Sequence, residues 1–421
     1  MNKKFLIDGI KNQALPLALL TVWALYIFAL YQFKLWASVG VPHMEPLFGD
    51  LHAILSAAEC HDRGLNVFVT NPCDALGRVH VYGSLWLNIT RLGLNPSHLM
   101  PLGIFIDLVF MAMAVFLIAP RSGKQIAITS LILFSPAVTL ALERANNDLI
   151  VFVLAAFSAI LISLRQQIAT LSSLCLIYLS SVLKLYPSVL FGTVLFFVKR
   201  RTKEIILITG VSFFLIACWL ITSLNEILLL KDIVPKPIDH YTTGAKTLFI
   251  YLGRPYPQIL LIPETWRLVA FTGFIAACAW WLAGRLIFTP LQPSKLGFKY
   301  TLFVFGLSIL FFTYTVNSNY DYRWIFFVLL IPYLFCLQQA AAKNTLARKM
   351  VDLSFNCALL VMWTEALRAG NFFGVLRFNS YFNIGRSTFS IELIQQFLKE
   401  LSAWLLFIIL IAFAIKQFSK R

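Results

Sequence analysis

The chain has 421 residues, of which 59% are hydrophobic and only 13% are charged, and its mean hydropathy is +0.78. Soluble domains are roughly half apolar and a quarter charged, so this composition excludes an ordinary soluble protein. A net charge of +16 would favour nucleic acid as the partner of a soluble chain. In a membrane chain basic residues orient helices and contact anionic lipid, so we expect membrane lipids and no nucleic acid as partners.

The first predicted element is an apolar run from Ala14 to Phe33 that follows three lysines. It is long enough to span a bilayer and longer than a typical signal-peptide core, so it predicts a retained helix. Further apolar runs predict an all-α, polytopic transmembrane helical bundle of about twelve spans, folded as a single domain over residues 1–421. The predicted spans are 14–34, 99–118, 126–142, 148–164, 168–183, 187–198, 205–224, 267–287, 299–315, 324–340, 350–366 and 401–417.

The connections between these spans differ in charge on the two sides of the membrane. Every short connection on one side is basic, as at 199–203 and 343–349. Since cytoplasmic loops are rich in lysine and arginine, both termini are predicted to be cytoplasmic. Outer loops are then expected at about 35–98, 225–266 and 367–400. Polar groups at the outer helix ends cannot face lipid, so they predict a cavity open to the non-cytoplasmic side.

The first outer loop contains a candidate catalytic base. Residues 50–60 predict a short amphipathic helix along the membrane interface. Asp50, at its start, is either a helix cap or a general base that takes the proton of an acceptor hydroxyl. The rest of the loop, with Arg78 and Tyr82, combines turn formers, aromatic rings and hydrogen-bonding groups. This composition suits a carbohydrate or a headgroup, although ordinary turns would account for it too.

The first outer loop also holds cysteines and histidines, which are candidates for a disulfide and for metal binding. Cys60 and Cys73 are the only cysteines on the predicted outer side, where an oxidising environment would permit a disulfide. His43, His52, His61 and His80 lack the usual ligand spacing. We therefore predict no metal site and no cofactor, while a requirement for a divalent cation stays open.

The segment 143–148 is a very polar connection between two apolar spans. A solvated turn would need fewer charged groups beside the hydrocarbon, which favours a functional interpretation. Arg144 is then a phosphate ligand, while Asn146, Asn147 and Asp148 bind sugar hydroxyls or hold the arginine. The alternative is an internally paired network that only fixes the turn.

Two later segments place cations at predicted helix ends. Lys184 precedes a tyrosine and a proline, and is either a snorkelling lysine or a phosphate ligand at a broken helix. The segment 320–323 opens the tenth predicted span. Its structural interpretation is a helix cap with an interfacial aromatic belt. Its functional interpretation places Arg323 on a phosphate, with Tyr320 and Tyr322 against a sugar.

Taken in order, these features resemble the GT-C superfamily of integral membrane glycosyltransferases, and most closely glycosyltransferase family 87, whose members use polyprenol-phosphate sugars. The resemblance covers about the first half of the chain, and the last hundred residues match only in hydropathy. The paired acidic motif of some GT-C members is missing. The features that carry the resemblance are Asp50, the 64–68 turn, the 71–78 stretch followed by Tyr82, the 143–148 turn, the 184–187 break and the 319–323 segment.

The resemblance implies transfer of a mannose-like hexose from a polyprenyl phosphate to a glycolipid or glycan acceptor on the non-cytoplasmic face. A bacterial inner membrane is the expected location. Asp50 would be the catalytic base, and Arg144, Lys184 and Arg323 would hold the donor phosphate. The residues expected to contact the sugar or acceptor are Arg78, Tyr82, Asn146, Asn147, Asp148, Tyr320 and Tyr322.

Two other functions fit the same composition. A transporter or flippase of a lipid-linked or anionic solute should place ionisable residues near the bilayer midplane on several helices. Here they cluster at the outer helix ends, which favours an enzyme. A polysaccharide polymerase or ligase is chemically close, but it would use lipid-diphosphate-linked glycans.

Overall fold

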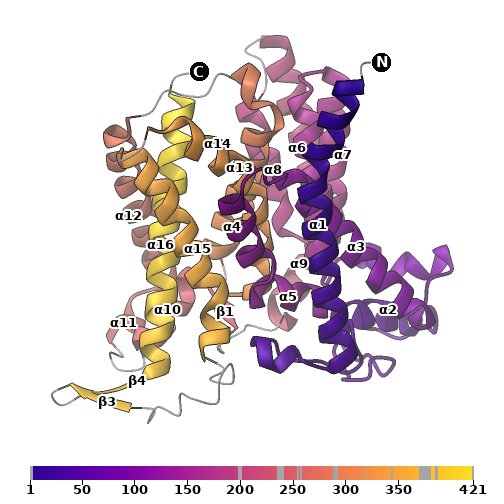
Figure 1. The fold of residues 1–421 in the computed structure, drawn as a ribbon. Coiled ribbons are helices and arrows are strands. Elements are labelled where there is room, and N and C mark those ends of the chain that lie inside the picture. The colour runs from indigo at the N-terminus through magenta and orange to yellow at the C-terminus, as the bar shows by residue number, and fades with distance from the viewer. Residues whose placement is uncertain are drawn as a thin grey trace.

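The fold is a bundle of helices with two short two-stranded ribbons (Figure 1). Seven helices of the described chain are long and apolar enough to cross a membrane, or eight if one bent pair counts as a span. An all-α polytopic membrane protein is therefore confirmed, and the count of twelve spans stays a prediction. The computed structural model describes residues 3–197, 202–234, 241–253, 256, 258–287, 293–316, 318–342, 345–368, 381–384 and 387–419.

The first half of the chain forms eight α-helices within the described residues, joined in part by 3₁₀ turns. The α-helices are α1 (Lys3–Phe33), α2 (Gly49–Asp62), α3 (Leu99–Ile118), α4 (Gly123–Leu133), α5 (Pro136–Glu143), α6 (Asn147–Ser163), α7 (Gln167–Leu183) and α8 (Val189–Val194). The 3₁₀ turns are η1 (Trp36–Val39), η2 (Ser84–Leu92), η3 (Pro96–His98), η4 (Tyr186–Ser188) and η5 (Leu195–Phe197).

The second half adds longer helices and both ribbons. The helices are α9 (Thr202–Ile233), α10 (Ala245–Gly253), α11 (Gln258–Leu261), α12 (Glu264–Arg285), α13 (Pro293–Val316), the 3₁₀ helix η6 (Asp321–Leu330), α14 (Ile331–Ala340), α15 (Leu346–Arg368) and α16 (Ile391–Phe418). Strand β1 (Thr242–Thr243) pairs with β2 (Asn319–Tyr320), and β3 (Tyr381–Ile384) pairs with β4 (Ser387–Ser390), both antiparallel.

Most predicted spans have other boundaries in the structure, as at 205–224, where α9 continues to Ile233, and two of these differences have a clear local cause. The predicted span 126–142 is broken into α4 and α5, which meet at 52°, because Pro136 cannot donate a backbone hydrogen bond and Ser135 caps the new helix. The last span was expected to begin at 401, after two charged residues. Instead α16 begins at Ile391, because Lys399 and Glu400 are buried against partners on other helices.

Helix η6 lies at the centre of the bundle. It packs against α13 and α5, and its segment 324–330 is entirely buried. Around it α6 packs against α7 and α13, while α16 packs against α12 and α15. Helix α9 in contrast exposes Phe213 and Ile221, by 74% and 80%, as a helix that faces lipid would.

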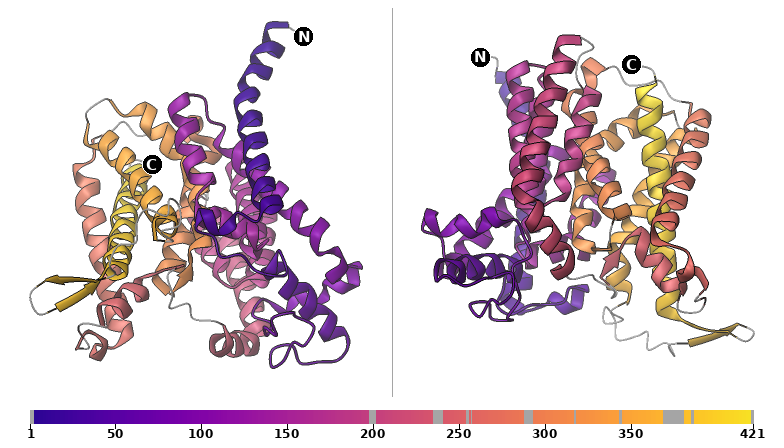
Figure 2. Two further views of the ribbon diagram at one scale, coloured as in Figure 1. Left: turned by 60° about the horizontal axis from the view of Figure 1, so that its bottom comes forward. Right: turned by 180° about the vertical axis from the view of Figure 1, so that it is seen from behind.

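The two ends of the bundle differ. Helix α1 begins and α16 ends at one end, whereas α2 and the β3–β4 ribbon lie at the opposite end (Figures 1 and 2). We call the latter the α2 end. The shared location of the helix ends agrees with termini on one side of a membrane, and their cytoplasmic assignment stays a prediction. The residues singled out from the sequence lie at the α2 end.

Candidate functional site

Asp50 lies in the first turn of α2, where that helix meets the turn after α5. The amide of Asp50 donates to the carbonyl of Arg144 at 3.2 Å, and the amide of Phe48 donates to that of Glu143 at 3.2 Å. The N-cap residue is Phe48, and no side chain caps the helix. The interpretation of Asp50 as a helix cap is therefore wrong, because its carboxylate points to the other side chains of the site.

The Asp50 carboxylate is placed between an amide and two guanidinium groups. Its Oδ2 accepts a hydrogen bond from Asn146 Nδ2. Its Oδ1 lies 3.7 Å from Arg78 Nη1 and 3.8 Å from Arg144 Nη1, and it accepts no hydrogen bond from a described residue. With 13% of the side chain exposed, Oδ1 is in position to take a proton from a bound hydroxyl.

The 143–148 turn is partly an internally paired network. Glu143 is fully buried and accepts hydrogen bonds from the amide of Met44 at 2.7 Å and from Arg144 Nε at 2.9 Å. The terminal nitrogens of Arg144 donate no hydrogen bond to any described residue, so they stay able to bind an anion. The structural alternative thus holds for Glu143 and leaves Arg144 as a candidate ligand.

The two asparagines of this turn have structural partners. Asn146 is the N-cap of α6, since its Oδ1 accepts from the amide of Asp148 at 2.8 Å while its amide nitrogen holds Asp50. Asn147 Nδ2 donates to the carbonyl of Leu183 at 3.2 Å, and its buried Oδ1 has no partner among the described residues. Asn146 is therefore placed to orient Asp50, whereas Asn147 keeps one unused acceptor.

Lys184 is not a snorkelling lysine. Only 13% of its side chain is exposed, and its Nζ forms an ion pair with the buried carboxylate of Asp148. The Nζ also lies 5.5, 5.8 and 5.7 Å from the ring centres of Tyr82, Tyr186 and Tyr322. Ammonium groups are attracted to aromatic faces at this distance, so the three rings and the carboxylate hold the charge in place.

The first loop reaches this lysine by close packing on the end of α7. The amide of Gly83 donates to the carbonyl of Leu183 at 3.3 Å. A Cβ at position 83 would lie only 1.8 Å from the carbonyl oxygen of Val182. Glycine is required here because the two backbones touch, and this contact brings the neighbouring Tyr82 over Lys184. Burial raises the pKa of Tyr82 well above its usual value, and the carboxylates of Asp50 and Asp148 raise it further.

Arg323 comes from the start of η6 and faces the same carboxylate. Its Nε lies 3.6 Å from Asp148 Oδ2, and its guanidinium stacks 4.9 Å from the ring centre of Tyr186. It donates no hydrogen bond to any described residue, and Nε is buried. Tyr320 and Tyr322 stack on each other at 5.5 Å beside it. These two rings belong to the site, and Tyr320 is 37% exposed.

Asp321 takes no part in this group of side chains. Helix η6 has no side-chain cap, and the carboxylate of Asp321 turns instead to Lys399 of α16, with Oδ2 2.6 Å from Nζ. Lys399 Nζ also donates to Glu365 at 2.9 Å, and all three side chains are at most 4% exposed. Sequence reasoning missed this buried cluster. The available signal was the presence of Glu365, Lys399 and Glu400 beside or within apolar runs.

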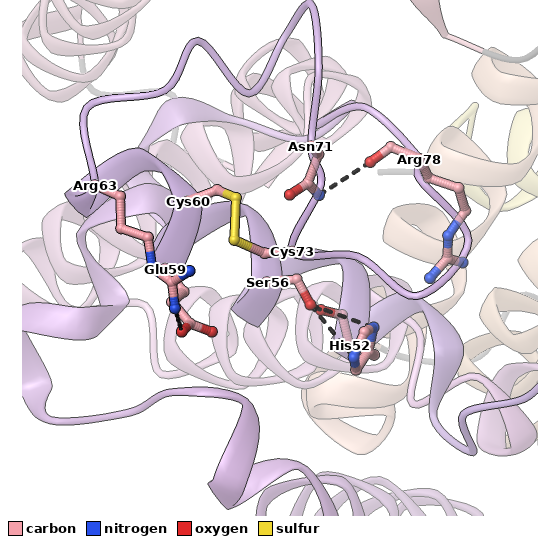
Figure 3. Close-up of a disulfide and its surroundings, with 8 residues drawn as sticks. All are labelled: His52, Ser56, Glu59, Cys60, Arg63, Asn71, Cys73 and Arg78. Carbon is pink, nitrogen blue, oxygen red and sulfur yellow. Dashed lines mark hydrogen bonds and ion pairs between the residues drawn. A yellow bond between two sulfur atoms is a disulfide. The ribbon is translucent and has the colours of Figure 1, made fainter.

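The loop beyond α2 is held by a disulfide and a buried acid. Cys60 and Cys73 form the disulfide that the sequence permitted (Figure 3). The carboxylate of Asp74 accepts hydrogen bonds from His52 and Arg78. Burial would raise the pKa of this carboxyl, but these hydrogen bonds hold it well below its usual range. Within the described residues no three His, Cys, Asp or Glu side chains are grouped to hold a metal ion.

The fold and this site define a polytopic helical membrane protein with cations and tyrosines gathered around two carboxylates at one end of its bundle. Comparison with protein-family models, curated proteins and solved structures finds no match for the chain.

Proposed function

We propose that this chain is a membrane glycosyltransferase that moves a mannose-like hexose from a polyprenyl-phosphate donor to a lipid or glycan acceptor. The observation that carries the proposal is that two arginines lie beside carboxylates without donating hydrogen bonds to them. Arg144 and Arg323 approach Asp50 and Asp148 at 3.8 and 3.6 Å, yet neither guanidinium donates a hydrogen bond to those carboxylates. Guanidinium groups match phosphate oxygens well, so unused donors in this setting favour a phosphate ligand.

The donor phosphate would bind between these cations. Lys184 adds a third positive charge. The carboxylate of Asp148 lies beside both Lys184 and Arg323. As the bond between the sugar and the phosphate oxygen breaks, negative charge grows on the leaving phosphate. Fixed cations in a site that excludes water stabilise that charge, which lowers the barrier of the transfer step.

Asp50 is the proposed catalytic base. The acceptor hydroxyl oxygen attacks C1 of the donor sugar, and its proton passes to Asp50 Oδ1. The bond from C1 to the phosphate oxygen breaks, and its electron pair stays on the polyprenyl phosphate. Arg78 and Arg144 lie beside Oδ1, and Asn146 holds Oδ2, so the base is oriented before the acceptor binds.

The sugar would be held by the tyrosines and by Asn147. The hydroxyls of Tyr82 and Tyr322 make no hydrogen bond with a described residue, and Asn147 Oδ1 is a buried unused acceptor. Rings with a polar edge suit a sugar, which presents an apolar face and a rim of hydroxyls. Asp148 is fully buried under Lys184 and Tyr186, so in this proposal it orients the cations.

The proposal places the α2 end on the non-cytoplasmic side of a bacterial inner membrane, with both termini in the cytoplasm and about twelve spans. The Cys60–Cys73 disulfide supports this side, because such bonds persist in oxidising compartments and are rare in the cytosol. Nucleotide sugars are made in the cytosol, so an enzyme facing outward needs a donor already carried across on lipid.

The test is transfer of label by the purified chain in lipid nanodiscs. Radiolabelled polyprenyl-phosphate mannose is supplied with a membrane lipid and glycan extract, and we expect label in the acceptor fraction. Labelled nucleotide mannose is the matched control donor and should give no product. Absence of transfer, together with flux of a lipid-linked or anionic solute in liposomes, would overturn the proposal in favour of a transporter.

A further inference from the structure

We propose that Asp74 is a positioning residue for Arg78, and that the Cys60–Cys73 disulfide sets the place of Asp74. The Asp50 end of the site is then complete only in the oxidised chain. The inference rests on the proposed function for its consequence in catalysis, but its structural content can be measured without a substrate.

The loop of residues 63–83 is clamped to α2 at both ends of that helix. Cys60 in the last turn of α2 carries the disulfide to Cys73 (Figure 3). At the first turn, Arg78 Nη2 donates to the carbonyl of Gly49 at 2.6 Å. A helix of this length extends about 20 Å, so two separate attachments set the course of the loop along it.

The apolar core beneath this loop is small. Cys60 packs with Ala57, Val67 and Leu87 in a cluster separate from the main core of the bundle. Even with Phe68 and Cys73 partly buried against them, these four side chains bury little surface, and hydrophobic stabilisation is proportional to the apolar area buried. A covalent link that closes a loop of this size contributes about 3 kcal/mol in the chain-entropy account, so the disulfide is a major part of what holds the loop.

Asp74 follows Cys73 directly and gathers five hydrogen bonds on a side chain with no exposed surface. Its Oδ2 accepts from the amides of Leu76 and Arg78 and from Arg78 Nε, at 3.2, 2.9 and 2.9 Å. Its Oδ1 accepts from His52 at 3.0 Å and from Arg78 Nη2 at 2.9 Å. A carboxylate with this many donors has no role as a base, but it fixes a guanidinium in two directions.

These hydrogen bonds place the third nitrogen of Arg78 beside the proposed catalytic base. Nε and Nη2 are bound by Asp74 and Gly49, and Nη1, which donates to the sulfur of Met44 at 3.2 Å, lies 3.7 Å from Asp50 Oδ1. Reduction of the disulfide by a dithiol yields two cysteine thiols and the oxidised, cyclic form of the reagent. Residue 73 is then released from α2, and Asp74 and Arg78 lose the tether that sets their place.

The experiment measures the rate at which phenylglyoxal, an arginine-selective dicarbonyl, modifies Arg78 in the full chain in nanodiscs, read by peptide mass spectrometry. We expect the rate to rise several-fold after reduction, in the Cys60→Ser/Cys73→Ser double variant, and in Asp74→Asn. Arg121, an exposed arginine between α3 and α4 and outside this loop, is the internal control and should react alike throughout. An unchanged Arg78 rate in the reduced and Asp74→Asn proteins overturns the inference, whatever the protein transfers.

Turnover provides the second measurement. The oxidised Arg78→Gln variant and the reduced wild type should each transfer label about tenfold more slowly than the oxidised wild type. Reduction of the Arg78→Gln variant should slow its transfer little further, because the substitution and the reduction remove the same group from the site. Additive losses would show that the disulfide acts elsewhere and would overturn the inference. Failure of the oxidised wild type to transfer any label counts against the proposed function alone, since the labelling rates still decide the inference.

Discussion

Asp148 Oδ2 and Arg323 Nε are buried 3.6 Å apart, and neither atom makes a hydrogen bond with any described residue. A buried charge normally satisfies its donors and acceptors, because an unmade hydrogen bond costs about 1 to 3 kcal/mol or more. Arg323 therefore gains from a ligand that brings oxygen atoms to its guanidinium, whereas Asp148 Oδ2, as an acceptor, gains only from a donor. The proposed donor phosphate would supply the oxygen atoms, and a sugar hydroxyl could supply the donor.

Asp50→Asn should lower the rate of sugar transfer by about 100- to 10,000-fold, the range for loss of a general base. The amide keeps the shape of the side chain, so donor affinity should change little. The measurement is initial velocity together with binding of polyprenyl phosphate. Asp62→Asn is the matched control, because Asp62 is an exposed acid at the other end of the same helix. Full turnover by Asp50→Asn would show that the base lies elsewhere.

Arg323→Gln should weaken binding of polyprenyl phosphate by about 10- to 100-fold, since a hydrogen bond to a charged group contributes roughly 1.5 to 3 kcal/mol. Affinity is measured by titration of the chain in nanodiscs. Arg285→Gln removes an exposed arginine in the last turn of α12, where its guanidinium covers Trp281. That control should bind as the wild type does, and equal loss in both variants would point to a general effect of charge.

The first loop should loosen as the pH falls from about 6.5 to 4. Burial, with a smaller contribution from the charge of His61, lowers the pKa of His80 to about 4. The ring lies between Phe68 and Tyr82 and donates to the carbonyl of Gly83. Below the ordinary histidine pKa of about 6.5 the open loop takes up a proton that the closed loop does not, so closure weakens by up to about 3 kcal/mol.

Asp74 does not contribute to this change, because its stabilisation of the closed loop is constant over that pH range. Its lowered pKa stabilises the closed loop above the ordinary aspartate value of about 3.9, and this contribution is lost only at still lower pH. Hydrogen exchange of residues 63–83 should therefore rise between pH 7 and pH 5, beyond the intrinsic change. His80→Phe should abolish the rise, and His61→Gln, which alters an exposed ring, should retain it. Equal responses in wild type and His80→Phe would refute the assignment.

Lys399→Met should destabilise the chain strongly. It removes the cation that binds Asp321 and Glu365, and taking one partner from a buried charge pair typically costs about 3 to 5 kcal/mol. The melting temperature in detergent is the measurement. Lys416→Met is the control, since that lysine lies in the last turn of the same helix and is only partly buried. Similar melting temperatures for the two variants would contradict the structural role of the cluster.

Much of the fold follows from local properties of the sequence. Apolar runs and their boundaries placed α3, α6 and α7 within one residue of the helices observed. The errors have local causes as well. Pro136 divides a span that hydropathy treats as continuous, and Lys399 and Glu400 look like the end of a span when their partners are unknown.

The sequence predicted which residues belong to the candidate site, but it did not predict which of them contact one another. Asp50, Arg144, Lys184 and Arg323 stood out because charge beside hydrocarbon is costly and is rarely retained without a use. The hydrogen-bond and ion-pair partners of these residues could not be predicted, because they are distant in the sequence. Asn146 bonds to Asp50 across 96 positions, and Lys399 reaches Asp321 across 78.

The sequence by itself therefore determined that this is a many-helix membrane protein whose distinctive charges lie near helix ends, because hydropathy and charge are read along the chain. Only the tertiary structure decided that Asp50 is not a cap, that Lys184 is enclosed by three tyrosines, and that Asp321 and Arg323, two residues apart, serve different clusters. The physical reason is that a buried charge is defined by its neighbours in space, and these come from helices that the chain brings together only on folding.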